Sequence, residues 1–201
     1  MNITDLYKIH HGGLIRSCDI KSYAISHGLL WSSVLVNISR WHKQGLLERV
    51  TRGAYLVRDV EVNAPVAACA LVPDGYISLE YAMSYHGMLL DRVYRLDLVS
   101  VRRVSSFCIR GIEIRVAKIP PRLYWGWEIK ESIHGPIRIA TPEKALFDRI
   151  YLDRTANPNY AYFEDMGLQP GAVNTERFAQ LAVQSPKVEC FCKSLREYCD
   201  G

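Results

Sequence analysis

Side chains that can read DNA recur along residues 31–44 at the spacing of one helical face. The face carries hydroxyl, amide and basic groups: Ser32, Ser33, Asn37, Arg40, Lys43 and Gln44. Asparagine suits adenine edges, arginine suits guanine edges, and the other side chains can meet phosphates. The same segment has an apolar stripe at intervals of three and four residues: Val34, Leu35, Ile38 and Trp41. This pattern predicts a helix with one buried face and one face available to nucleic acid.

A basic hairpin is predicted directly after this helix. Gly45 is the residue type that ends helices in a left-handed conformation. Two short apolar runs follow, at residues 46–50 and 54–57, and a connection that contains Gly53 joins them. Arg49 and Arg52 make this hairpin basic. A polar-faced helix that leads into a basic hairpin is typical of the recognition helix and wing of a winged helix-turn-helix.

Two shorter helices are predicted before the recognition helix. The first covers residues 3–10, and the second runs from residue 18 or 19 to about residue 26, with Ser17 as its cap. In a helix-turn-helix the start of the second helix touches backbone phosphate, which makes Arg16, Ser17 and Lys21 candidate contacts. Residues 1–60 are therefore predicted to be a winged helix-turn-helix that binds DNA. The alternative is an amphipathic helix whose polar face is merely solvated.

The charge distribution favours the DNA-binding interpretation. The 201 residues carry 25 Lys and Arg against 21 Asp and Glu, a formal net charge of +4. Residues 1–60 hold eight of the basic and four of the acidic residues, so the whole excess lies in this segment. A positive excess confined to one segment is expected of a surface that meets phosphates.

Residues 61–201 are predicted to be a second, mixed α/β domain with a small antiparallel sheet, which makes the whole chain α+β. A helix capped by Ser78 covers residues 79–86, and another begins at Thr141 and Pro142. Alternation with a period of two predicts strands between residues 92 and 119. Residues 157–171 are predicted to be a loop, followed by helices at 175–184 and 186–198.

The predicted strands of this second domain are also basic. Residues 92–122 hold eight Lys or Arg against two acidic residues. We expect a secondary basic surface that includes Arg102, Arg103, Arg110 and Arg115. The alternative is an ordinary solvated sheet face whose charge is balanced elsewhere in the chain.

Two motifs follow the predicted winged helix, one from Ser78 to Met88 and one from Thr141 to Asp148. They resemble motifs of the AbiEi family of antitoxins from type IV toxin–antitoxin (abortive infection) systems. The family motif S-x-x-S-A-x-x-x-H-G-L appears here as Ser78, Tyr81-Ala82 and His86-Gly87-Met88. The family motif T-x-x-E-(R/K)-A-L-x-D appears as Thr141, Glu143, Lys144-Ala145-Leu146 and Asp148. Tyr81 and Met88 depart from the family pattern. The similarity covers about residues 3–152. It implies a DNA-binding transcriptional autorepressor that also counteracts a nucleotidyltransferase-like toxin of the same operon, with residues 61–201 as the antitoxin domain.

The partners that follow are operator DNA, expected to contain inverted repeats, and the toxin, with or without direct contact. No membrane partner, cofactor or metal is expected, and the chain is expected to be cytoplasmic with its six cysteines reduced. The chain is not expected to be an enzyme: Glu143 and Asp148 suit helix dipoles and ion pairs. Two alternatives stay open, a winged helix that docks protein and, less favoured, a metal-dependent nuclease built on Asp97, Glu128 and Lys130.

Overall fold

The computed structural model describes residues 1–91 and 93–200; Arg92, at the start of the predicted basic strands, lies outside them. Contacts divide the chain into two compact units. Unit 1 consists of Met1–Pro73, Phe107–Glu113 and Glu131–Pro136, and unit 2 consists of Asp74–Ser106, Ile114–Lys130 and Ile137–Gly201. Compactness does not measure independent folding, so the predicted domain division at residues 60 and 61 stays a prediction.

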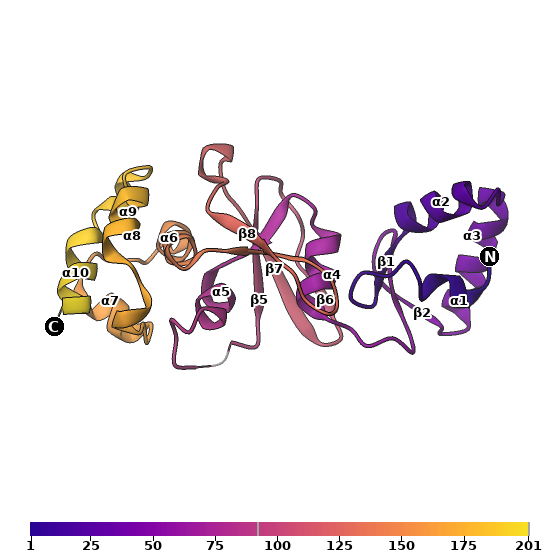
Figure 1. Cartoon of the computed structure of the whole chain (residues 1–201), viewed down its shortest axis with the longest axis horizontal. Helices are drawn as coiled ribbons and strands as arrows, with labels where there is room; N and C mark the ends of the chain where they lie inside the picture. The colour runs from indigo at the N-terminus through magenta and orange to yellow at the C-terminus, as the bar shows by residue number, and fades with distance from the viewer. Residues whose placement is uncertain (92, 201) are drawn as a thin grey trace. The chain divides into compact units, whose positions relative to one another are not determined.

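Unit 1 is a mixture of helices and one small antiparallel sheet (Figure 1). Its elements up to residue 71 are α1 (Ile3–Leu6), β1 (Leu14–Arg16), α2 (Ser17–Ser26), α3 (Trp31–Lys43), β2 (Leu47–Thr51), β3 (Ala54–Val57) and α4 (Ala64–Leu71). The strand order is β1-β3-β2, with Leu14 opposite Leu56 and Leu47 opposite Val57. The sheet therefore joins the segment before α2 to the hairpin after α3.

The core of unit 1 corrects two details of the sequence prediction. Val34, Ile38 and Trp41 are buried in it, but Leu35 is 47% exposed, so the stripe on α3 is narrower than predicted. The first helix ends at Leu6 instead of residue 10. Beyond it the amides of residues 8 and 9 donate to carbonyls only three residues back, which tightens the chain into turns.

Unit 2 contains most of a six-stranded sheet that is mixed, not small and antiparallel as predicted. The strand order is β6-β7-β5-β4-β9-β8. The strands are β4 (Gly75–Ile77), β5 (Leu96–Ser100), β6 (Phe107–Ile109), β7 (Ile112–Lys118), β8 (Trp127–Lys130) and β9 (Ile137–Ala140). Strands β4 and β9 are parallel, as are β5 and β7, whereas β4 and β5, and β8 and β9, are antiparallel. Alternation with a period of two identifies strands but not their direction, which explains the error.

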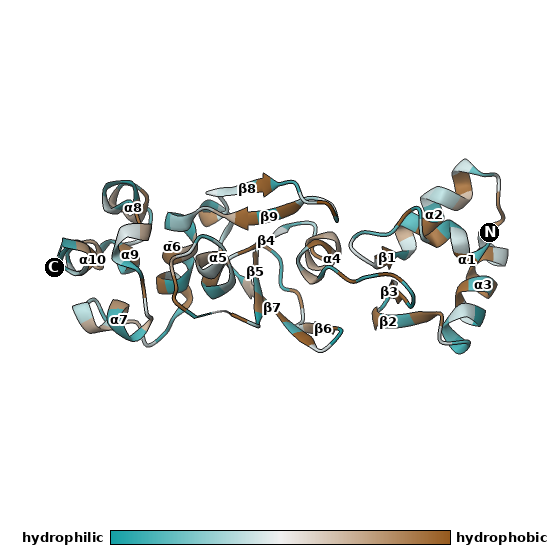
Figure 2. Ribbon diagram, turned by 60° about the horizontal axis from the view of Figure 1, so that its bottom comes forward, coloured by the Kyte–Doolittle hydropathy of each residue, from teal (hydrophilic) through white to brown (hydrophobic). Residues whose placement is uncertain are grey.

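Helices make up the rest of unit 2. They are α5 (Leu79–Tyr85), α6 (Pro142–Leu152), α7 (Tyr160–Asp165), α8 (Thr175–Ala182), α9 (Pro186–Glu189) and α10 (Cys192–Asp200), with short 3-10 turns at Pro121–Leu123 and Pro170–Ala172. The predicted loop at 157–171 thus contains α7, which Asn159 caps and whose Phe163 is fully buried. The predicted helix at 186–198 is broken in two. Figure 2 shows the apolar colouring of β9, where Ile139 and Ala140 are buried.

The two motifs that begin at Ser78 and at Thr141 meet in the core of unit 2. Lys144 and Asp148, both fully buried, form an ion pair one helical turn apart, with 2.7 Å between Nζ and Oδ1. The hydroxyls of Tyr76 and Ser78 donate to the other carboxylate oxygen at 2.9 and 2.8 Å. Ser78 is the N-cap residue of α5, as predicted, but its side chain binds Asp148 and makes no hydrogen bond to the helix. The ammonium of Lys144 also donates to the carbonyl of Leu123.

Burial dominates the electrostatics of this pair. It raises the pKa of Asp148 and lowers the pKa of Lys144, because removal from water disfavours both charged forms. The ammonium lies 4.3 Å from the centre of the Trp125 ring. The expected ion pairs are confirmed for both acidic residues of the motif, since Glu143, also buried and in the first turn of α6, has its carboxylate 3.7 Å from Arg177.

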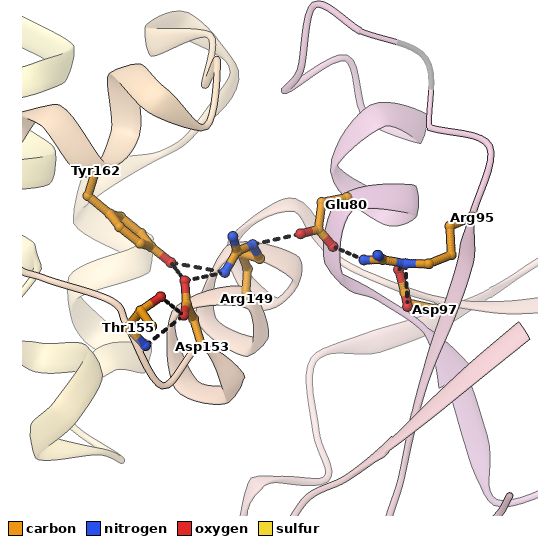
Figure 3. A network of polar contacts seen from close by, with 7 residues as sticks. All are labelled: Glu80, Arg95, Asp97, Arg149, Asp153, Thr155 and Tyr162. Carbon is orange, nitrogen blue, oxygen red and sulfur yellow. Dashed lines mark hydrogen bonds and ion pairs between the residues drawn. The ribbon is translucent and has the colours of Figure 1, made fainter. Parts of the chain in front are cut away.

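A second polar network connects strand β5 with helices α5, α6 and α7 of unit 2 (Figure 3). Glu80 binds two arginines, Arg149 at 2.7 Å and Arg95 at 3.4 Å. Arg149 continues to Asp153 at 2.6 Å, and Asp153 accepts from the hydroxyl of Tyr162 at 3.2 Å. The network thus links α7 through α6 and α5 to Arg95, which binds Asp97 of β5 at 2.8 Å. Within residues 1–91 and 93–200, no helix is long and apolar enough to span a membrane.

Candidate nucleic-acid interface

Helix α3 presents a solvent-facing polar surface because its other face is anchored in the core of unit 1. Ile38 and Trp41 are 5% and 4% exposed. At the end of the helix the amide of Gly45 donates to the carbonyl of His42, and the amide of Leu46 donates to Trp41. These two bonds are the Schellman arrangement, and Gly45 allows it at φ +70°. The predicted helix end is confirmed, and the turn directs the chain from α3 straight into β2.

The polar face of α3 is exposed in most of the predicted positions. Ser32, Ser33, Arg40, Lys43 and Gln44 are exposed, and Asn37 is half-buried. Arg40 donates to the side-chain oxygen of Asn37 at 3.0 Å. The amide nitrogen of Asn37 donates to the carbonyl of Met1 at 3.5 Å. The two residues suited to base edges are therefore adjacent and orient one another.

Val36 also belongs to this face, which the sequence reasoning missed. Its side chain is 68% exposed. With Ser39, Arg40, Lys43 and Gln44 it lines a depression of about 400 Å³ on α3. An exposed aliphatic group among polar ones can contact a thymine methyl. Val36 could have been found from the sequence as an apolar residue that lies outside the buried stripe of α3.

The β2–β3 hairpin places two arginines at its surface. Arg49 and Arg52 are exposed, and the pairing shifts register between Arg49 and Thr51. The amide of Ser17 donates to the carbonyl of Gly53 at 2.7 Å. This bond holds the tip of the hairpin against the start of α2. Arg52 and the first turn of α2 consequently belong to one local surface, with Lys21 exposed one turn further along.

Arg16 differs from the other predicted contacts because protein groups already occupy its guanidinium. It binds both carboxylate oxygens of Asp19, at 2.9 and 2.7 Å, and the carbonyl of Ala70 at 3.1 Å. The hydrogen bond to Asp19 raises the pKa of Arg16, and although burial opposes it, the same bond lowers the pKa of Asp19. Arg16 also precedes α2 as its N-cap residue, the place predicted for Ser17. Arg16 thus joins α2 to α4 and has fewer donors for DNA.

The four arginines of the predicted secondary basic surface fall in different units. Arg102, Arg103 and Arg115 belong to unit 2, and Arg110 belongs to unit 1. All four are exposed. Arg102 forms an ion pair with Asp74 at 2.9 Å, and Arg103 lines a depression together with Lys118. The surface that they were predicted to form together stays a prediction.

The groups considered for a nuclease do not converge. Asp97 lies on β5 and Glu128 on β8, and strands β4 and β9 separate them. Three strand spacings amount to about 14 Å, too far for a shared metal ion. Asp97 binds Arg95, and Glu128 binds Lys130 at 2.8 Å. No group of three His, Cys, Asp or Glu placed to hold a metal occurs among the described residues. In that same part of the chain none of the six cysteines forms a disulfide.

Comparison with known protein families finds a match in the N-terminal segment. Residues 6–58 match the family described as "Transcriptional regulator, AbiEi antitoxin". The predicted resemblance to AbiEi antitoxins is confirmed over these residues, which contain α2, α3 and the hairpin. The matched family is one of regulatory antitoxins, not of enzymes. No curated protein matches the chain.

Proposed function

We propose that residues 1–60 form a winged helix-turn-helix that binds operator DNA and represses transcription of its own operon. Helix α3 is the recognition helix in this proposal, and the β2–β3 hairpin is the wing. The contacts come from α2, α3 and the wing: Ser17, Lys21, Ser32, Ser33, Asn37, Arg40, Lys43, Gln44, Arg49 and Arg52. Val36 adds an apolar contact, and Arg16 positions Asp19 and the start of α2.

The exposed polar face of α3 is the single observation that carries this proposal. Its residue types are those of base and phosphate readout, and Asn37 and Arg40 lie one turn apart in mutual contact. The hairpin that follows is basic and is fastened to the start of α2 by the Ser17–Gly53 bond. This bond supports placing the wing beside the first turn of α2 in one DNA-binding surface, and the family match supports a role in transcription.

We further propose that residues 61–201 act as the antitoxin domain. They would counteract a nucleotidyltransferase-like toxin encoded by the same operon, in the cytoplasm. The support is the resemblance of the Ser78–Met88 and Thr141–Asp148 motifs to those of AbiEi antitoxins, together with the family match of residues 6–58. An operator with inverted repeats is the corresponding DNA partner. Arg102, Arg103 and Arg115 of unit 2 are the part of the candidate secondary basic surface that lies within this unit, and Arg110 belongs to unit 1.

Binding of the full chain to its own promoter DNA tests the first proposal. With four to six phosphate contacts, the logarithm of affinity should fall against the logarithm of salt with a slope of about −4 to −5. Asn37→Ala or Arg40→Ala should weaken operator binding by about 1–3 kcal/mol, while Asn37→Ala leaves non-specific binding nearly unchanged. Affinity that does not depend on salt would refute DNA binding by this surface. A greater loss of base preference in Arg52→Ala would mean that the wing, not α3, reads the bases.

Co-expression with the neighbouring toxin tests the second proposal. The Asn37→Ala/Arg40→Ala variant should lose repression and still protect cells when a foreign promoter drives it. Replacement of Arg102, Arg103, Arg110 and Arg115 by Ala should instead weaken protection, DNA binding or both. If the folded and abundant α3 variant fails to protect, neutralisation depends on DNA binding and the two activities are not separable.

A further inference from the structure

Unit 1 has a basic depression beside the hairpin, of which the predicted contact surface includes only Arg49. It has a volume of about 500 Å³. Three arginines, one histidine and one carboxylate line it: His42, Glu48, Arg49, Arg58 and Arg110. Arg49 comes from β2, Arg58 follows β3, and Arg110 comes from the turn between β6 and β7, some fifty residues later in the chain. The fold of unit 1 thus gathers three guanidinium groups that the sequence separates.

The position of Arg110 is built by a tight turn. Arg110 has φ +50° and Gly111 has φ +83°, the two positive values of a type I′ turn. Arginine is an unusual residue at the first of these positions, where asparagine, aspartate and glycine are favoured because a Cβ strains the backbone. The strain is offset by two contacts of the side chain. Its guanidinium donates to the carbonyl of Arg58 at 3.3 Å and lies 3.5 Å from the carboxylate of Glu48.

The electrostatics of the depression favour an anion. Three guanidinium groups face one carboxylate, which leaves a charge of +2 with His42 neutral. The ring nitrogen Nδ1 of His42 lies 2.9 Å from the carbonyl of Leu47 and donates to it, which orients the imidazole. Arg110 is 42% exposed and Glu48 58% exposed, so an incoming group can reach both. Guanidinium groups grouped in this way match the geometry of phosphate oxygens.

We propose that this depression binds a phosphate of the DNA backbone beside the operator bases, through Arg58 and Arg110 together with Arg49. The inference rests on the proposed function of α3 and the wing, and it extends the DNA surface to a turn outside residues 1–60. A backbone phosphate is favoured over a free anion because Arg49 belongs to the same hairpin as Arg52 and because the depression is open to solvent. Glu48 holds the guanidinium of Arg110 in place until the phosphate replaces it.

Salt dependence of binding measures this contact directly. Asparagine tolerates the left-handed backbone of residue 110, so Arg110→Asn removes the charge without added strain. Each lost phosphate contact should flatten the salt slope by about 0.9. The affinity deficit of Arg110→Asn relative to wild type should therefore shrink about 3.5-fold between 50 and 200 mM salt. Arg58→Ala should behave similarly, Arg110→Lys should retain most of the affinity, and Arg154→Asn, an exposed arginine of unit 2, serves as the matched control.

The same experiments separate this inference from the proposed function. If Arg110→Asn and Arg58→Ala keep the wild-type slope while Asn37→Ala loses operator preference, the proposed function stands and this inference is overturned. If the wild-type protein shows no salt-dependent DNA binding, both fail. Titration of the DNA-free protein with inorganic phosphate distinguishes the source of the anion. Binding below 1 mM phosphate that Arg110→Asn abolishes would assign the depression to a free anion and overturn the backbone contact, whereas no such binding supports it.

Discussion

Removal of the Lys144 ammonium should destabilise unit 2 by an amount that depends on pH. Lys144 and Asp148 are fully buried at 2.7 Å, where two unit charges interact by about 6 kcal/mol at an effective dielectric constant of about 20. In Lys144→Met the shape of the side chain against Trp125 is largely kept, but Asp148 loses its counter-charge. The loss of one partner of a buried pair costs about 3–5 kcal/mol.

Protonation of Asp148 limits that cost. Since pH 7 is about three units above the ordinary pKa of aspartate, protonation of the carboxyl costs about 4 kcal/mol at that pH, at about 1.4 kcal/mol per unit. In the variant the native pKa of Asp148 rises further, whereas the unfolded pKa stays ordinary. The native state then holds the proton over a pH range in which the unfolded state has released it. Stability must therefore fall as pH rises through that range.

Hydrogen exchange of the α6 amides at pH-corrected rates is the suitable assay, because the two units need not unfold together. The deficit of Lys144→Met should be near 4 kcal/mol at pH 7 and should decrease by about 1.4 kcal/mol per unit toward pH 5. The exposed pair Lys193–Glu197 has the same spacing of four residues, so Lys193→Met is a matched control that should cost less than about 0.5 kcal/mol. A deficit in stability below about 1 kcal/mol at pH 7, or one that does not change with pH, would show that Lys144 is not the counter-charge of an ionised Asp148.

Three further predictions concern single residues. Although burial opposes the effect, hydrogen bonds from Thr155 and Arg149 lower the pKa of Asp153. The ionised Asp153 therefore stabilises the fold above about pH 4, and this contribution is lost as pH falls. In urea unfolding, Asp153→Asn should be less stable than wild type at pH 7 and approach it near pH 2. Gly45→Ala should cost about 1–2 kcal/mol because residue 45 has φ +70°, and an unchanged urea midpoint would contradict this. Leu35→Gln should cost less than about 0.5 kcal/mol whereas Ile38→Ala should cost about 2–5 kcal/mol, and equal effects in thermal unfolding would show that α3 packs differently.

Much of unit 1 could be predicted from its sequence because local rules govern its elements. Apolar spacing placed α2 and α3, Gly45 marked the end of α3, and the run around Gly53 marked the hairpin. Most of the predicted polar positions of α3 are exposed because one buried face leaves the other in water, but Asn37 is half-buried. The same rules wrongly predicted that Leu35 is buried and that the first helix extends to residue 10. Spacing does not show how wide a face of a helix the core covers or where a short helix ends.

Sequence patterns could not show which distant residues meet, because such contacts depend on the packing of whole elements. The carboxylate of Asp148 accepts hydrogen bonds from Ser78 and Tyr76, about seventy residues away in the chain, only because α6 packs near β4. The direction of β9 and β7 likewise depends on the path of the connecting chain and not on alternation. Arg110 became part of unit 1 for the same reason. Local sequence patterns predicted most elements of unit 1 and their charges, whereas the packing of whole elements determines which charged groups are exposed on α3 and the hairpin and which are buried in pairs.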